Sequence, residues 1–164
     1  LDFHVLVEVH GEHALVDDVT PGRSALVLAQ VPAQKAATAR EAGIVTAGEM
    51  DHWQLNAELV TLSACETALG RNVFGEGTIG FAYPLLHAGA RSMLASRWPV
   101  NDEATALLMG RFYANWLGAK GARSMRKAEA LREAKQWLRA WKTRDGRQPY
   151  QNPYYWASFV LVGR

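Results

Sequence analysis

The sequence predicts an α/β fold in which a mostly parallel sheet is flanked by helices in three layers. Short runs rich in apolar and β-branched residues alternate along the chain with longer segments whose apolar residues recur at helical spacing. The run at 58–64 is apolar almost throughout, which is typical of a strand covered on both faces of a parallel sheet. Strand, crossover helix and strand in succession favour parallel pairing.

The composition fits a single domain over residues 1–164 that buries its own core. Hydrophobic residues make up 49% of the 164 residues, and charged residues 21%. The one cysteine cannot form an internal disulfide, so a reducing, cytoplasmic setting is expected, with no cofactor. No apolar run approaches the roughly 20 residues that span a bilayer, so we expect a soluble protein without a membrane partner.

Three strand-like runs occupy the first part of the chain, at residues 3–9, 24–30 and 58–64. Turn residues and glycines interrupt the chain between them, as is usual around strands. We expect the first two of these strands to lie side by side. Before the third strand, residues 46–53 predict a short helix capped by Thr46, in which Glu49 completes a capping box.

Helices and strands alternate in the second part of the chain. Helices are predicted at residues 78–88, 101–117 and 122–142, and strands at 91–98 and 154–162. Gly89 is expected to close the first of these helices, and Asn101 to cap the second. The residues expected to face the core are Ala104, Leu107, Leu108 and Phe112 in the second helix, and Met125, Ala128, Leu131, Leu138 and Trp141 in the last.

His10 and Cys65 stand at the carboxyl ends of two predicted strands, where open α/β sheets place reactive groups. A cysteine attacks as its thiolate, and at the ordinary pKa near 8.5 only about 3% is ionised at neutral pH. A nearby imidazole that lowers this pKa by roughly two units would ionise about three quarters of it. The simpler alternative is a small core cysteine and a turn histidine.

His10 is the best placed of the five histidines to serve Cys65. It combines a strand end with a following glycine, Gly11, whose backbone N–H can approach a substrate carbonyl oxygen. The pattern therefore predicts nucleophilic catalysis by this pair, provided that their two strands are neighbours.

Three separated segments of the sequence resemble one known family. They are LSACETALG at residues 62–70, the segment from FGEGTIG to FYANWL at 74–117, and NPYYWASFVLVG at 152–163. Together they resemble the CHAT domain, a caspase-like cysteine-peptidase family often joined to tetratricopeptide repeats. The likeness covers the chain from about residue 24 onward. It implies a caspase-like sheet that lacks its N-terminal strands, as in the C-terminal part of a longer protein.

The resemblance also implies roles for particular residues. Cys65 would be the nucleophile and His10 its catalytic partner, while the backbone N–H groups of Gly11 and Cys65 would hold the oxyanion. The substrate would be a protein or peptide. A tetratricopeptide-repeat region in the parent chain, or in a partner, is the implied neighbour.

Two further segments are expected to border the substrate cleft. Ser96-Arg97-Trp98 resembles the caspase-like strand beside the cleft. Glu76 lies in the Gly-punctuated loop at 70–77, which we expect to wall the site around the thiol.

Glu8 and Val9 depart from the family, which usually has a small polar residue after an alanine before its His-Gly pair. This departure leaves a non-catalytic CHAT-type signalling or interaction domain as the alternative function.

Two other functions are disfavoured. Residues 120–147 hold ten Lys/Arg against three Asp/Glu, which raises nucleic-acid binding. Basic residues around a helix are more often a solvated face, however, and no reading motif accompanies them. A metal site at His10-Gly11-Glu12-His13 is weaker still, because no further ligand cluster is evident.

Overall fold

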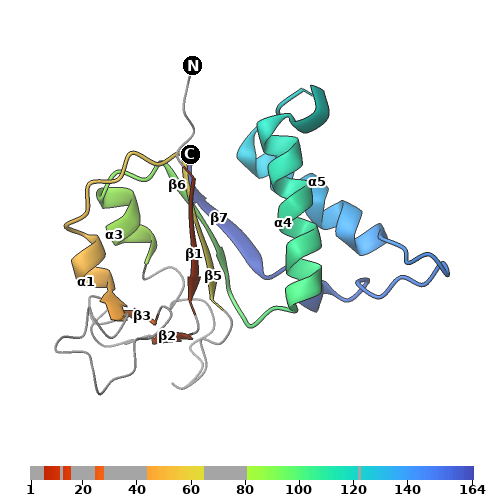
Figure 1. Ribbon diagram of the computed structural model, residues 1–164, viewed down its shortest axis with the longest axis horizontal. Coiled ribbons are helices and arrows are strands. Elements are labelled where there is room, and N and C mark those ends of the chain that lie inside the picture. Colours follow the sequence, from red (N-terminus) through yellow and green to blue (C-terminus); the bar gives the residue numbers. More distant parts are fainter. Residues whose placement is uncertain (1–5, 12, 16–24, 28–43, 65–80, 122) are drawn as a thin grey trace. The chain divides into compact units, whose positions relative to one another are not determined.

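The computed structural model in Figure 1 describes residues 6–11, 13–15, 25–27, 44–64, 81–121 and 123–164. The chain divides into two compact units. Unit 1 comprises Leu1–Pro99 and Val162–Arg164, and unit 2 comprises Val100–Leu161. A single domain over residues 1–164 stays a prediction.

Unit 1 is built around a sheet with the strand order β1-β5-β6-β7. Its elements in chain order are β1 (Leu6–Gly11), β2 (His13–Leu15), β3 (Ala25–Val27), β4 (Ile44–Thr46), α1 (Ala47–Met50), β5 (Leu59–Ala64), α3 (Ala82–His87), β6 (Ser92–Ser96) and the end of β7 (Phe159–Gly163). The central strand β5 pairs in parallel with β1 on one side and with β6 on the other. The predicted α/β class with a mostly parallel sheet is confirmed.

The expectation that the strands at 3–9 and 24–30 lie side by side is wrong. β3 pairs antiparallel with β2 and β4 in a separate three-stranded sheet, whereas β1 pairs with β5. β5 is the apolar, β-branched run that suits a central strand, so it accepts β1 as a parallel neighbour. The strands β2, β3 and β4 are only three residues long, and each pairs antiparallel with the next one along the chain.

Helices α1 and α3 lie side by side on one side of this sheet (Figure 1). α1 begins as predicted: the hydroxyl of Thr46 accepts a hydrogen bond from the backbone N–H of Glu49 at 3.2 Å. The carboxylate of Glu49 accepts in return from the backbone N–H of Thr46 at 2.8 Å. The buried residues that join these helices to the sheet are Ala47, Met50, Ala57, Val60, Leu62, Phe81, Ala82, Leu85, Ala90, Met93 and Ala95.

α3 is shorter than the predicted helix at 78–88, of which residues 78–80 lie outside the described residues. Pro84 is the third residue of the helix, where its missing N–H removes no intrahelical bond. Gly89 follows the helix end at φ +107°, a backbone conformation that favours glycine. The prediction that the helix closes at Gly89 is therefore confirmed.

Unit 2 contains two packed helices, α4 (Asp102–Leu117) and α5 (Lys127–Ala140). The short helical turns η3 (Ala119–Gly121) and η4 (Pro153–Tyr155) follow α4 and precede β7. The cap at Asn101 is confirmed, because its side-chain oxygen accepts from the backbone N–H of Ala104 at 2.9 Å. The buried residues of α4 are Ala104, Leu108, Met109, Phe112 and Trp116, whereas Leu107 is only half-buried.

The core face of α5 agrees with the predicted one at Leu131 and Leu138 but not at Ala128. Ala128 is exposed, and the buried residues are Ala130, Leu131, Ala134 and Leu138. Alanines at four-residue spacing form this face, and their weak hydrophobicity hides it from a sequence reading. Met125 and Trp141 lie outside the helix and are half-buried.

The predicted strand at 154–162 begins later than expected, because its first part forms η4. Asn152 caps that turn by accepting from the backbone N–H of Tyr154 at 2.9 Å. Pro153 stands at the first helical position, which its fixed φ favours.

Candidate active site

The parallel strands of unit 1 end together at one edge of the sheet, which we call the carboxyl edge. It is formed by the last residues of β1, β5 and β6: His10 and Gly11, Ser63 and Ala64, and Ser96. Because β1 and β6 both pair in parallel with β5, these three ends point the same way. Open parallel sheets bind their ligands at such edges.

The register of β1 against β5 places His10 opposite Ser63 and Gly11 opposite Ala64. Neighbouring strands lie about 4.8 Å apart. Cys65 is the residue that follows Ala64 in the sequence, so the chain reaches it directly from the end of β5. The condition set by the sequence, that the strands ending at His10 and before Cys65 be neighbours, is met. Cys65 and Glu76 lie outside the described residues.

β5 is held firmly because it occupies the interior of the sheet. Leu59 and Thr61 are fully buried, and Val60 and Leu62 belong to the core between the sheet and its helices. Apolar residues at successive positions bury both faces of the strand. This burial fixes the register of β5 and therefore the position of its carboxyl end.

Contacts at the start of the strands set the same register. The hydroxyl of Ser92 donates to the carbonyl oxygen of Glu58 at 2.7 Å. The backbone N–H of Arg91 donates to the carbonyl oxygen of Ala57 at 2.9 Å, and its guanidinium pairs with the Glu58 carboxylate at 2.5 Å. A slip of β6 by one residue would break all three interactions.

Ser96, Arg97 and Trp98 leave the sheet at the end of β6. The register pairs Leu62 with Ala95, so Ser96 and Ser63 are the next residues along their strands. Ser96 is buried, Arg97 is exposed and Trp98 is half-buried. This segment therefore extends the carboxyl edge on the far side of β5 from β1.

The sequence reading did not single out Ser63, which the register places opposite His10. Its position two residues before Cys65 in the sequence was the available signal. Among the residues that the structure describes, no three His, Cys, Asp or Glu side chains gather as ligands of a metal ion. Of the described helices, none has both the length and the apolar composition needed to cross a bilayer.

Residues 12–164 match the family described as the CHAT domain. The chain belongs to the CHAT domain family. This family is related to the caspase-like cysteine peptidases, in agreement with the α/β class of the fold.

Relatives of this CHAT domain include two large repeat proteins. Tetratricopeptide repeat protein 28 of Mus musculus is 30% identical over 121 residues, and its Homo sapiens counterpart is 28% identical over 120 residues. Each match covers 73% of this chain and 4% of the relative. The CHAT domain chain thus matches only a small part of the length of these proteins.

The family match covers the ends of β5 and β6 in the carboxyl edge, but not the end of β1. It includes the segment that holds Cys65 and the end of β6. It begins at residue 12, directly after His10 and Gly11. The likeness to CHAT domains therefore covers Cys65 but not His10.

Proposed function

We propose that this CHAT domain is a cysteine endopeptidase in which Cys65 is the nucleophile and His10 its general base and acid. The parallel register of β1 and β5 supports this most, because His10 lies opposite Ser63, two residues before Cys65. Two neighbouring strand ends can bring an imidazole and a thiol within the hydrogen-bond reach that such a pair needs.

The proposed reaction has two steps. His10 takes the proton of the Cys65 thiol, and the thiolate attacks the carbonyl carbon of a peptide bond. The C–N bond then breaks, His10 gives its proton to the departing amine, and a thioester links Cys65 to the acyl half of the substrate. In the second step, His10 removes a proton from a water molecule, which attacks the thioester. The C–S bond then breaks, His10 returns its proton to the Cys65 sulfur, and the products are a carboxylic acid and the free thiol.

Backbone donors stabilise the oxyanion of each tetrahedral intermediate. We assign this role to the N–H groups of Gly11 and Cys65. Gly11 is the last residue of β1 and pairs with Ala64, so it belongs to the carboxyl edge. Removing a donor of this kind typically lowers kcat by about 100-fold or more.

The cleft for a protein or peptide substrate would run along the carboxyl edge past the end of β6. Arg97 is exposed there and Trp98 half-buried, so the segment offers a charged group and an aromatic surface. Glu76 is proposed as a further residue of the cleft wall.

The test compares cleavage of a proteome-derived peptide library by the full-length protein and three variants. Cys65→Ala is expected to abolish cleavage, and His10→Gln to lower the rate by about 100-fold. His52→Ala is the matched control, because His52 is exposed and its ring nitrogen lies 3.0 Å from the carbonyl oxygen of Gly48, in the turn after α1. Equal cleavage by the native protein and Cys65→Ala would exclude the proposal.

A non-catalytic interaction domain is the second candidate. The family match that begins after His10, and Glu8-Val9 before it, favour this alternative. Alkylation by iodoacetamide at several pH values separates the two functions. An activated thiol reacts at a similar rate at pH 6.5 and pH 8.5, whereas an ordinary thiol slows by about tenfold for each pH unit below its pKa.

We further propose that a tetratricopeptide-repeat region accompanies this domain, in the same chain or as a partner. The two relatives are both named as tetratricopeptide repeat proteins. A cytoplasmic setting fits the single cysteine, because a catalytic thiol must stay reduced.

A further inference from the structure

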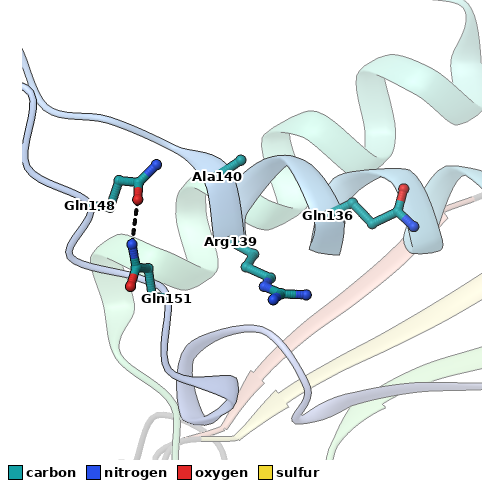
Figure 2. Close-up of a pocket in the computed structure, with 5 residues that line it drawn as sticks. All are labelled: Gln136, Arg139, Ala140, Gln148 and Gln151. Carbon is teal, nitrogen blue, oxygen red and sulfur yellow. Dashed lines mark hydrogen bonds between the residues drawn. The ribbon is translucent and has the colours of Figure 1, made fainter.

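A basic recess lies on unit 2 between α5 and the chain segment that follows it. It consists of two hollows of about 430 Å³ and 560 Å³, which share Gln136 and Arg139 in their walls. Figure 2 shows Gln136 and Arg139 on α5, with Gln148 and Gln151 on the following segment. Among the described residues, no Asp or Glu lines either hollow.

Three cations of α5 line the recess: Arg132, Lys135 and Arg139. Their spacing of three and four residues puts them on one face of the helix, over about 10.5 Å from first to last. Arg132 and Arg139 are exposed, and within the described part of the chain neither forms an ion pair. The walls of the two hollows therefore carry a concentrated positive charge, with no acidic side chain among their described lining residues.

Lys135 is the most constrained of the three cations. It is half-buried, and its ammonium donates to the carbonyl oxygen of Phe159 at 2.7 Å. An ammonium has three N–H donors, and a carbonyl brings no opposite charge. Burial lowers the pKa of Lys135. A carboxylate in the recess would supply the charge and the acceptors that this group lacks.

The rest of the recess suits a polypeptide. Gln148 and Gln151 are hydrogen-bonded to each other, and like Gln136 they carry amide groups that both donate and accept, as a peptide backbone does. The half-buried side chain of Trp156 adds an aromatic surface beside the cations. Single-stranded nucleic acid is usually bound by several aromatic rings on which its bases stack, whereas Trp156 is the one aromatic residue among the described residues that line the two hollows.

We propose that this recess binds an acidic peptide segment of a partner protein, with its carboxylates on Arg132, Lys135 and Arg139. An extended peptide rises about 3.3 Å per residue, so acidic residues two or three positions apart span about 7 to 10 Å. This span matches the separation of the cations along α5. The excess of seven positive charges over residues 120–147 would speed the encounter. No residue of the carboxyl edge takes part, so the inference stands whether or not the domain is a peptidase.

The experiment measures fluorescence anisotropy of a labelled heptapeptide with four glutamates around one leucine. The full chain is used as its Cys65→Ala variant, so that cleavage cannot alter the peptide. Changing Arg132, Lys135 and Arg139 together to Gln is expected to weaken binding by about tenfold or more. The matched control changes Arg123, Arg126 and Arg144 to Gln, which removes the same charge from exposed positions outside the recess.

The control is expected to bind the peptide within about threefold of the starting protein, since only screened charge is lost. A second peptide with glutamine in place of glutamate should bind at least about tenfold more weakly. Arg139→Gln alone should reproduce part of the loss, because Arg139 is exposed and its replacement removes no core contact.

Three results would overturn the inference. They are an equal loss in the recess variant and the control, equal binding of the glutamine peptide, and tighter binding of a single-stranded oligonucleotide of the same charge that depends on the three cations. The last result would assign the recess to nucleic acid.

Discussion

Removing the ion pair between Arg111 and Glu133 by substitution is expected to lower the free energy of unfolding, because these two residues join α4 to α5 through several hydrogen bonds. The Arg111 Nε donates to the two carboxylate oxygens of Glu133 at 3.2 and 3.0 Å, and a terminal guanidinium nitrogen donates at 2.5 Å. The side-chain amide of Asn115 donates to the same carboxylate. Arg111 also lies over the ring of Trp137, 5.6 Å from its centroid.

The magnitude depends on solvent screening. A buried hydrogen bond to a charged group contributes about 1.5 to 3 kcal/mol, and an exposed ion pair about 0.2 to 1 kcal/mol. The side chains of Arg111 and Glu133 are 40% and 30% exposed. We therefore expect a coupling free energy of about 1 kcal/mol between them. Glu133→Gln alone should lower the free energy of unfolding by about 1 to 2 kcal/mol, because Asn115 also loses its charged acceptor.

Urea unfolding of four full-length proteins measures this coupling: the native chain, Arg111→Gln, Glu133→Gln and the double variant. Arg147 and Asp145 serve as the control pair, with Nε 2.6 Å from the carboxylate and side chains 79% and 56% exposed. That pair is expected to show no measurable coupling, because solvent surrounds it.

The coupling should also depend on pH. The hydrogen bonds from Arg111 lower the pKa of Glu133, burial opposes this shift, and Asn115 adds to it. A folded-state pKa below the unfolded value means that the stabilisation is fully present above the ordinary carboxyl pKa of about 4.3. It is lost as the pH falls through the lowered value. A coupling that is absent at pH 7, or that grows on acidification, would refute this reasoning.

Two further predictions concern single side chains, each measured as the free energy of unfolding in urea. Gly89→Ala should lower the free energy of unfolding by about 2 to 4 kcal/mol, because the new Cβ would lie 2.1 Å from the carbonyl oxygen of Leu55 at a φ of +107°. Gly110→Ala in α4 is the contrasting variant. It should raise the free energy of unfolding by about 0.5 to 1 kcal/mol, because no atom lies within 4 Å of the new Cβ. Ser158→Ala should raise the free energy of unfolding by about 1 kcal/mol, because the Ser158 hydroxyl is buried with no hydrogen-bond partner among the described residues. A lower free energy of unfolding would mean that this hydroxyl has a partner.

The features that sequence reasoning placed correctly depend on neighbouring residues. The capping box of Thr46 and Glu49 and the cap at Asn101 need only a side chain and a backbone N–H three residues away. The central strand β5 was also predicted, because a short and almost continuous apolar run is typical of a strand that is buried on both faces.

The features that it missed depend on distant residues. The sequence around β3 (Ala25–Val27) does not indicate that this strand pairs with β2 and β4 rather than with β1. The phase of α5 is set by packing against α4, so Ala130 and Ala134 are buried although Ala128 is not. For the carboxyl edge, the sequence indicated which strand ends carry His10 and Cys65, but only the register placed His10 opposite Ser63.

The pairing of β1 with β5 joins residues that are more than fifty positions apart. A ribosome-bound chain that stops short of β5 therefore has no carboxyl edge at all. The connection between the two strands also contributes to the core of unit 1, because Ala47 and Met50 of α1 and the later Ala57 are buried there, so replacing α1 would remove core residues as well.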